Sequence, residues 1–285
     1  SAVAGHGDEL KAIVIGGGKI SEQHLCVLKG LPKVTVAGVC DLSPALSRFT
    51  AERFSVPDWF TDYRKMLSSC GTNVVHVLTP PATHDRIVRD SLEAGAHVIV
   101  EKPIALSNPE FKSLWDLASS RGLHLIENHN YRFNTPIQTL ERMVREGRIG
   151  SIEEVEARMS LNVRGGGRYA DENLPHPSHQ LPAGIIHEFI THLAYLLLHF
   201  MPENSIDKLD RIQAAWRNHG GGSLFNYDDL DALVIADSVH GRIRFACSQW
   251  PDSFSVTLRG SDGTATAELF HPDVMLYPGV RSVST

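Results

Sequence analysis

A carboxylate and an imidazole stand four residues apart in the second half of this sequence, as Glu188 and His192. The apolar pattern from Ala183 to Phe200 predicts a helix, and residues four apart share one face of a helix. The carboxylate can orient the ring and favour its protonated form, and this pairing suits a general base. The alternative is a helix that packs on a sheet with a few satisfied polar groups.

A zinc site is the competing interpretation of the same helix, because His187 and Glu188 begin like the motif H-E-x-x-H. The second histidine, His192, stands one residue too late for that motif, so the two imidazoles diverge around the helix. His176 and His179 precede the helix, but a chain with 15 histidines contains chance clusters. We therefore expect no metal site.

Lys102 is the other candidate for chemistry. It lies in Glu101-Lys102-Pro103, directly after a predicted buried strand from His97 to Val100. An ammonium group there can hydrogen-bond a substrate oxygen and stabilise negative charge on it. The alternative is a solvated surface lysine. The position at the carboxyl end of a strand favours the first interpretation, because ligands of open α/β sheets bind at that edge.

A glycine turn provides the element that would position a ligand beside this lysine. A predicted strand, Ala12 to Ile15, is followed by Gly16 and Gly18 at the first two glycine positions of G-x-G-x-x-G, with Ser21 at the third. Such a turn brings the backbone close to a pyrophosphate, and the helix that follows offers unpaired N–H groups to the anion. The alternative is an ordinary loop between a strand and a helix.

An acidic residue strengthens the dinucleotide interpretation. Asp41 follows a predicted second strand, Lys33 to Cys40, and can accept both ribose hydroxyls of an adenosine. A 2′-phosphate would be repelled there, and Leu42 and Ser43 supply no arginine. NAD is therefore favoured over NADP, although Arg48, one helical turn further on, leaves that choice open.

The order of the predicted elements indicates two domains. Up to about residue 130, buried strands alternate with helices, which predicts a doubly wound parallel sheet, the Rossmann fold. From Gly150 onward the pattern has a period of two, as in Val155, Ala157 and Met159, which predicts antiparallel strands. We expect a Rossmann domain over residues 1–130 and an α+β domain with a large, mainly antiparallel open sheet over residues 131–285.

Composition excludes several classes of partner. The chain has 285 residues and a net charge of -6 without a basic cluster, so nucleic acid is not expected. No apolar run is long enough to span a membrane, and residues 1–8 lack a signal-peptide core, so they are expected to be a processed or added tail. Cys26 and Cys40 lie on predicted buried elements, and scattered cysteines suit a reduced, cytoplasmic protein.

These motifs resemble those of the glucose–fructose oxidoreductase / inositol dehydrogenase (Gfo/Idh/MocA) family, and the resemblance covers nearly the whole chain. It rests on Gly16-Gly-Gly-Lys-Ile-Ser21, Asp41, Thr79-Pro80-Pro81-Ala-Thr-His84, Glu101-Lys102-Pro103, Asn130-Tyr131-Arg132-Phe133-Asn134 and the helix with Gly184, Glu188 and His192. In such proteins the lysine and the helix histidine are the implied catalytic groups, with an aspartate four residues before the histidine. Glu188 replaces that aspartate, which would shift the geometry of the pair, and Ile190 replaces a usual glycine.

The resemblance implies a set of site residues. Cofactor contacts are expected at Gly16, Gly18, Lys19, Ile20, Ser21, Asp41, Thr79, Pro80, His84, Glu101, Lys102, Asn130 and Arg132. Substrate contacts are expected at Lys102, Arg164, Arg168, Tyr169, His176, His179, His187 and His192. The family's chains commonly continue past the last strand, so we also expect a truncated C-terminal tail.

The activity that the resemblance implies is an NAD-dependent oxidoreduction of a secondary alcohol on a sugar, a sugar derivative or a polyol. His192 would remove the hydroxyl proton, Lys102 would hold the same oxygen, and Glu188 would steady the imidazole. A homodimer or homotetramer through the second sheet is expected. Three alternatives stay open: an NAD-dependent glycosidase of the same family, a non-catalytic dinucleotide-binding module, and a methyltransferase with a similar glycine turn.

Overall fold

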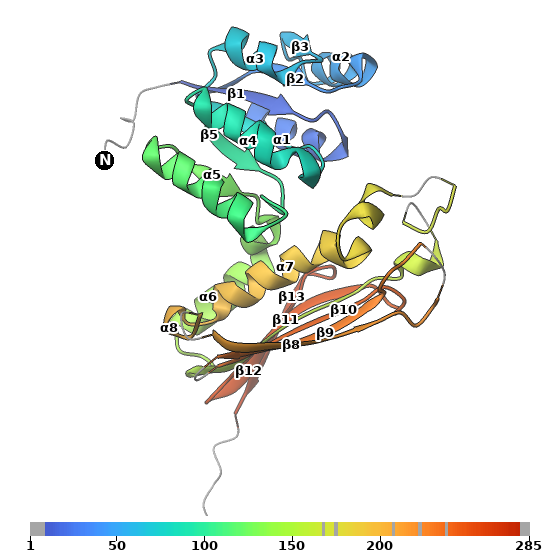
Figure 1. Cartoon of the computed structure of the whole chain (residues 1–285). Helices are drawn as coiled ribbons and strands as arrows, with labels where there is room; N and C mark the ends of the chain where they lie inside the picture. Colours follow the sequence, from blue (N-terminus) through green and yellow to red (C-terminus); the bar gives the residue numbers. More distant parts are fainter. Residues whose placement is uncertain are drawn as a thin grey trace, which may run out of the picture. The chain divides into compact units, whose positions relative to one another are not determined.

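The computed structural model describes residues 9–166, 169–173, 176–206, 209–221, 224–236 and 239–279. The chain separates into two compact units, the first ending at Asn128 and the second beginning at His129 (Figure 1). Each unit has its own sheet and its own apolar core.

The first unit contains a six-stranded sheet in the order β3-β2-β1-β4-β5-β6, with every neighbouring pair parallel. Its strands are β1 (Leu10–Ile15), β2 (Val34–Cys40), β3 (Asp58–Phe60), β4 (Val74–Val77), β5 (His97–Val100) and β6 (Leu125–Glu127). The predicted doubly wound parallel sheet is confirmed. The short strand β3 was not predicted, because three residues are too few to show a periodic pattern.

Helices cover both faces of this sheet. The helices are α1 (Lys19–Gly30), α2 (Pro44–Arg53), α3 (Tyr63–Cys70), α4 (His84–Glu93) and α5 (Asn108–Ser120). Along β1, Ala12 and Val14 pack with residues of α1 and α2, whereas Ile13 and Ile15 pack with residues of α3, α4 and α5. The alternation follows from the period of two in a strand, and both faces of β1 are apolar because both are covered.

The second unit contains a seven-stranded sheet in the order β13-β12-β11-β7-β10-β9-β8. Its strands are β7 (Ile152–Ser160), β8 (Leu209–Arg217), β9 (Asp229–Ala236), β10 (His240–Ala246), β11 (Ser253–Gly260), β12 (Gly263–Glu268) and β13 (Asp273–Pro278). All neighbouring pairs are antiparallel except β7 with β10. The predicted, mainly antiparallel sheet is confirmed, and β13 is an additional strand.

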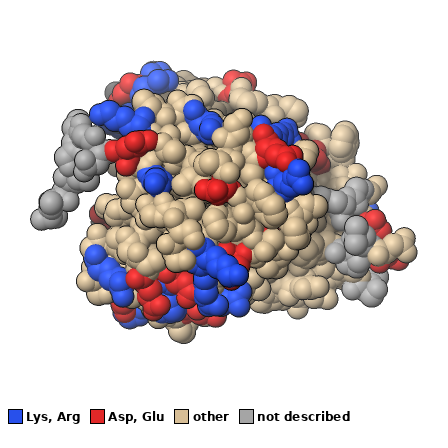
Figure 2. Space-filling model, turned by 90° about the horizontal axis from the view of Figure 1, so that it is seen from above, with Lys and Arg blue, Asp and Glu red and all other residues tan. Residues whose placement is uncertain are grey.

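One face of the second sheet is packed against helices. Val155, Ala157 and Met159 of β7 lie in one apolar cluster with residues of α6 (Thr135–Arg145) and α7 (Gly184–Phe200). The opposite face carries ion pairs, such as Arg242 with Asp231. On the face of the molecule seen in Figure 2, basic and acidic side chains are intermixed, with no large area of one sign.

The four cysteines are free. Cys40, Cys70 and Cys247 are buried, and burial raises the pKa of Cys40 and Cys247 to about 12. Cys26 is exposed, so the expectation that it would be buried is wrong. It lies on α1, where Leu25 and Leu28 face the sheet instead.

Candidate active site

The glycine turn joins β1 to α1 and has two differently constrained glycines. Gly16 has a φ of +107°, and a Cβ added there would lie 2.7 Å from the carbonyl oxygen of Leu78, so only glycine fits. Gly18 has a φ of -68° and is the N-cap of α1. Apart from its chain neighbours and the nearby backbone of α1, a Cβ at Gly18 would meet no described atom within 4 Å. The fold therefore requires Gly16, whereas Gly18 leaves open space at the N-terminus of a helix.

Ser21 closes the first turn of α1. Its hydroxyl and its backbone N–H both donate to the carbonyl oxygen of Gly18, at 2.6 and 2.9 Å. The side chain is fully buried. A small residue is needed at this third position of the motif, because the helix starts close to the sheet.

Asp41 is attached to the glycine turn by its carboxylate. Oδ2 accepts the backbone N–H of Gly17 at 2.8 Å, and Oδ1 accepts the backbone N–H of Ser43 at 2.9 Å. A carboxylate has about four acceptor positions, so two remain for other donors. Arg48 pairs with Glu52 on the exposed surface of α2, at 2.7 Å.

His84 connects the loop after β4 to the loop after β5. Its side chain is fully buried, with Nε2 2.7 Å from the carbonyl oxygen of Thr79 and Nδ1 2.8 Å from that of Pro103. Burial lowers the pKa of His84, although the two carbonyls favour the charged ring. Both ring nitrogens are thus engaged by backbone, and the contact of His84 with a cofactor stays a prediction.

Further contacts fix the loop that carries Lys102. Glu127 accepts the backbone N–H of Ile104 through Oε1, at 2.6 Å. Lys102 itself is half-buried, and Pro103 beside it is buried. The backbone just after Lys102 is therefore held by two side chains, those of His84 and Glu127, and the N–H of Glu101 just before it donates to the backbone carbonyl of Val77.

Glu101 lies at the centre of a polar network that the sequence analysis did not predict. Its Oε1 accepts from Asn128 Nδ2 at 2.6 Å and contacts His24 Nε2 at 3.2 Å. Burial opposes ionisation of Glu101, but hydrogen bonds from His24 and Asn128 and the charge of Lys102 outweigh it and lower the pKa. The network continues from His24 to His76, whose Nδ1 lies 2.9 Å from that of His24. The sequence contains one sign of it, because His76 interrupts an otherwise apolar strand.

In the second unit, His192 lies on α7 with 8% of its surface exposed. Its Nδ1 lies 3.1 Å from the hydroxyl of Tyr195, which also accepts the backbone N–H of Tyr131 at 3.1 Å. The same hydroxyl is oriented to donate to Asn130 Oδ1 at 3.4 Å. All three contacts are satisfied when His192 carries its proton on Nδ1. Nε2 of the neutral ring is then the basic atom.

Tyr195 is therefore an orienting partner of His192 that the sequence analysis missed. Glu188 and His187 are half-buried on the same helix, and the role of Glu188 beside the ring stays a prediction. Asn130 and Arg132 lie in the 3₁₀ turn Asn130–Phe133 of the second unit. Their predicted contact with a cofactor is not established by these positions.

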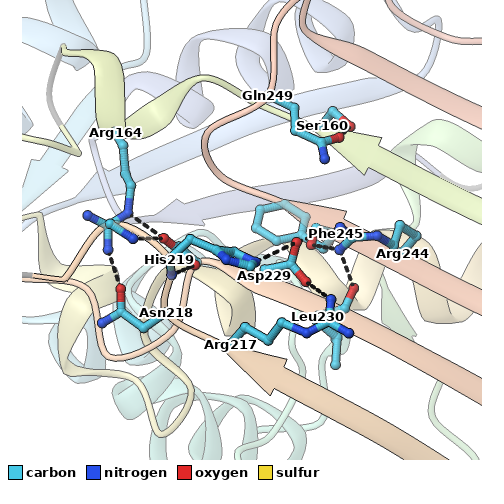
Figure 3. Close-up of polar contacts among 12 residues, drawn as sticks. Ser160, Arg164, Arg217, Asn218, His219, Asp229, Leu230, Arg244, Phe245 and Gln249 are labelled. Carbon is cyan, nitrogen blue, oxygen red and sulfur yellow. Dashed lines mark hydrogen bonds and ion pairs between the residues drawn. The ribbon is translucent and has the colours of Figure 1, made fainter.

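Arg164, predicted to contact substrate, is held by the protein itself (Figure 3). Its Nε lies 2.8 Å from Oδ2 of the buried Asp228, although the N–H does not point at that oxygen. The terminal nitrogens donate to Asn218 Oδ1 at 2.6 Å and to the carbonyl oxygen of Gly221 at 3.0 Å. The guanidinium also lies over the ring of Phe225, 4.6 Å from its centroid.

The other predicted substrate residues of this loop form one cluster. Tyr169 packs against His176 and against Phe189 of α7, with ring centroids 4.6 and 5.7 Å apart. His179 donates from Nε2 to the carbonyl oxygen of Tyr169, at 2.8 Å. Arg168 lies outside the described residues. The structure brings Tyr169, His176 and His179 together near α7.

Within the described ranges, no three His, Cys, Asp or Glu side chains are placed to hold a metal ion. Among the same residues, no helix combines the length and the apolar character that crossing a membrane requires.

Comparison with known proteins decides the class of the first unit. Residues 10–129 match the model of the Gfo/Idh/MocA oxidoreductase family, described as having an NAD-binding Rossmann fold. The chain carries the NAD-binding domain of the Gfo/Idh/MocA oxidoreductase family. The predicted family and the predicted NAD cofactor are thereby confirmed for this domain.

Curated relatives are similar over part of their length. The chain is 28% identical to D-glucoside 3-dehydrogenase of Escherichia coli over 171 residues, which is 58% of this chain and 48% of the relative. It is 31% identical to glycosyl hydrolase family 109 protein 2 of Akkermansia muciniphila over 160 residues, 52% of this chain and 33% of that protein. The chain spans about half or less of the length of the curated relatives it matches.

The likeness to solved structures extends over nearly the whole chain. The structure of levoglucosan dehydrogenase in complex with NADH and levoglucosan matches with a TM-score of 0.83 and 18% sequence identity. The match covers 96% of this chain and 77% of that one. At this identity the likeness establishes the fold of both units and leaves the reaction to chemical argument.

Proposed function

We propose that this protein is an NAD-dependent oxidoreductase that transfers a hydride between a secondary alcohol of a sugar or polyol and the nicotinamide. The observation that carries the proposal is the half-buried Lys102 on a braced loop at the carboxyl edge of an NAD-binding sheet. Ligands of such sheets bind at that edge.

The residues of the first unit fit the cofactor. Gly18 leaves open space at the N-terminus of α1, where the first amides of a helix lack intrahelical partners and favour an anion. Asp41 keeps acceptor positions for a ribose diol beyond its two backbone contacts. When bound there, NAD supplies the hydride acceptor.

The chain's own residues then have separate tasks. Lys102 donates from Nζ to the reacting oxygen of the substrate and stabilises the charge that develops on it. His192 accepts the hydroxyl proton at Nε2, because its Nδ1 is committed to Tyr195. Glu188 supports the charged imidazole through its position one turn away on α7.

Sugars are the proposed substrate class. Two of the relatives are named D-glucoside 3-dehydrogenase and levoglucosan dehydrogenase. The net charge of -6 and the intermixed charges on the face seen in Figure 2 favour a neutral small molecule over a polyanion.

A substrate screen tests the proposal. NAD reduction is followed at the NADH absorbance band with a panel of sugars, glucosides, anhydrosugars and inositols, for the wild type, Lys102→Met and His192→Ala. We expect turnover with at least one compound and a loss of about a hundredfold or more in either variant. Equal rates in the wild type and Lys102→Met would contradict the assigned role of the lysine.

An NAD-dependent glycosidase is the second candidate, favoured by the similarity to the glycosyl hydrolase family 109 protein. Such an enzyme oxidises the sugar transiently and reduces it again, so no net NADH accumulates. Release of the aglycone from a nitrophenyl glycoside without NADH formation would identify this activity instead.

We also propose that two copies associate through the face of the second sheet that no helix covers in the described residues. This face has a shallow cavity of about 340 Å³ lined by Glu154, Asp231, Leu233, His240, Gly241 and Arg242. Sedimentation equilibrium measures the mass directly, and a monomer at micromolar concentration would contradict this assembly.

A further inference from the structure

A histidine lies inside the buried strand β4. His76 is 6% exposed, and the sheet register aligns it with Val14 of β1 and Ile99 of β5. Val14 packs in the apolar cluster that includes Leu25 of α1, so His76 occupies a position at which the neighbouring strands carry aliphatic residues. An imidazole buried there is costly unless its polar atoms find partners.

The partner of His76 is His24, which is on α1, one turn after the glycine motif. The two Nδ1 atoms are 2.9 Å apart, and the rings meet edge to face with centroids 5.2 Å apart. The other nitrogen of His24, Nε2, lies 3.2 Å from Glu101 Oε1. Asn128 completes the chain of contacts by donating to the same oxygen at 2.6 Å. The network therefore joins α1 to residues of β4 and to the ends of β5 and β6.

The protons in this network can be assigned from charge. Burial, with the neighbouring His24, lowers the pKa of His76 to about 4, so His76 is neutral near pH 7. Glu101 is ionised, because its pKa is lowered despite burial. Facing a carboxylate, His24 carries a proton on Nε2. The 2.9 Å contact between the two Nδ1 atoms needs one proton between them, and His76 Nε2 has no part in it. That atom is buried without a hydrogen-bond partner among the described residues.

We propose that His24 and His76 are a positioning pair that fixes the Glu101 carboxylate and, through it, the ammonium of the adjacent Lys102. The inference rests on the proposed function, in which Lys102 holds the substrate oxygen. His84 and Glu127 hold the backbone after Lys102, through the carbonyl oxygen of Pro103 and the N–H of Ile104. The histidine pair adds what those contacts lack, a fixed negative charge that interacts electrostatically with Lys102, the next residue in the chain.

The test compares two replacements of His24. His24→Leu keeps an apolar volume and removes both contacts, whereas His24→Gln keeps a donor near the position of Nε2. With the sugar identified in the screen, we expect His24→Leu to lower kcat by about tenfold to a hundredfold. KM and the Kd for NADH should change by less than about threefold, since neither requires the lysine to be held at one angle. His24→Gln should recover most of the loss.

His97→Leu is the matched control. His97 begins β5, the strand that ends before Glu101, and its ring contacts another histidine, His124, with centroids 5.0 Å apart. It lies at the opposite end of the strand, so this variant should keep the wild-type kcat. A comparable loss in His97→Leu would show that any disturbance of β5 lowers the rate, and would overturn the inference.

A second measurement does not depend on turnover. The titration of the Glu101 carboxyl is followed by ¹³C NMR on protein with labelled glutamate, and Glu101→Gln identifies its signal. The pKa of Glu101 should rise in His24→Leu and return toward the wild-type value in His24→Gln. If no sugar is turned over, the proposed function fails, but the change in the pKa of Glu101 still tests the role of His24 and His76. An unchanged Glu101 titration in folded His24→Leu, shown by a cooperative melting curve, overturns the proposal. If His24→Leu does not fold, His76→Leu, which restores an aliphatic residue to β4, must give the same rise.

Discussion

Asp41 Oδ2 accepts the backbone N–H of Gly17 at 2.8 Å, so the acidic residue after β2 and the glycine turn after β1 form one rigid corner. The glycine turn therefore also limits the directions in which the remaining acceptor positions of this carboxylate can point. In the proposed function this hydrogen bond links the residue expected to accept the ribose hydroxyls to the loop expected to hold the phosphates.

Asp41→Ala should weaken NADH binding by about tenfold to a hundredfold, because hydrogen bonds to a charged group contribute about 1.5–3 kcal/mol each. NADPH binding should weaken less, since the carboxylate repels a 2′-phosphate. Isothermal titration calorimetry with both cofactors measures the two changes. Arg48→Ala, which removes an exposed side chain paired with Glu52, is the control and should leave the NADH affinity unchanged. Equal losses for NADH and NADPH in Asp41→Ala would show that Asp41 is not the ribose acceptor.

The two glycines of the turn should separate folding from binding. Gly16→Ala places a Cβ 2.7 Å from a carbonyl oxygen at a φ of +107°, and should lower the free energy of unfolding by about 1–3 kcal/mol or more. Gly18→Ser introduces a favourable N-cap at a φ of -68°, so stability should stay within about 0.5 kcal/mol. Its side chain nevertheless fills the open space at the N-terminus of α1, and the Kd for NADH should rise at least tenfold. Urea unfolding and fluorescence titration provide the two values, and tight binding by Gly18→Ser would refute the placement of the pyrophosphate.

Arg164 and Asp228 should contribute to stability. Asp228→Asn leaves the Arg164 guanidinium beside a neutral group in a site where the carboxylate is fully buried, and breaking such pairs costs about 3–5 kcal/mol. Arg242→Met breaks an exposed pair with Asp231 on the open face of the sheet and should cost less than about 1 kcal/mol. Thermal and urea unfolding of both variants make the comparison. An Asp228→Asn protein that is as stable as the wild type but has a raised KM for the sugar would contradict this structural role and support the predicted substrate contact of Arg164.

His76 should make stability depend on pH. Its pKa falls from the ordinary value of 6.5 to about 4 on folding, so between these values the unfolded chain binds a proton that the folded chain excludes. The contribution is complete above pH 6.5 and is lost as the pH falls toward 4, with a slope of about 1.4 kcal/mol per pH unit. The buried His84, whose pKa is also lowered, acts in the same direction. Urea unfolding from pH 7 to pH 4 should show that the free energy of unfolding of His76→Leu depends less steeply on pH than that of the wild type, by up to about 1.4 kcal/mol per pH unit.

The residues expected to bind the cofactor could be predicted from local sequence patterns. The polar network around Glu101 could not, because it depends on contacts between residues far apart in the chain. Gly16 and Asp41 stand directly after a buried strand and Lys102 stands two residues after one, so their common edge follows from the parallel sheet alone. The contacts of Glu101 with His24 join residues 77 apart, and no periodicity reports such a pair. Helix α6 has a proline in its first turn and apolar spacing at Ile137 and Leu140, so its signal was present and was missed.

The relative direction of neighbouring strands also could not be predicted from the alternation of apolar and polar residues. Alternating residues in β7 and β10 indicate one covered face in either orientation, and the two strands pair in parallel within a mainly antiparallel sheet. The surroundings of His192 were hidden for a related reason. Its contact with Tyr195 is three residues away on the same helix, but the backbone N–H that fixes the tyrosine comes from Tyr131, 64 residues away.

Tyr195→Phe should therefore affect both stability and catalysis. Loss of the hydroxyl leaves the partly buried N–H of Tyr131 without this acceptor, and the free energy of unfolding should fall by about 1 kcal/mol. His192 Nδ1 loses the acceptor that selects its tautomer, so Nε2 is unprotonated in only part of the molecules and kcat should fall by about tenfold, with KM for the sugar little changed. ¹⁵N NMR of the imidazole in the wild type should show the proton on Nδ1, and a mixture of tautomers in the variant. Tyr277→Phe, at an exposed tyrosine of β13, controls for the loss of a hydroxyl and should match the wild type. A wild-type ring protonated on Nε2 would make His192 a hydrogen-bond donor toward the substrate and would exclude it as the general base.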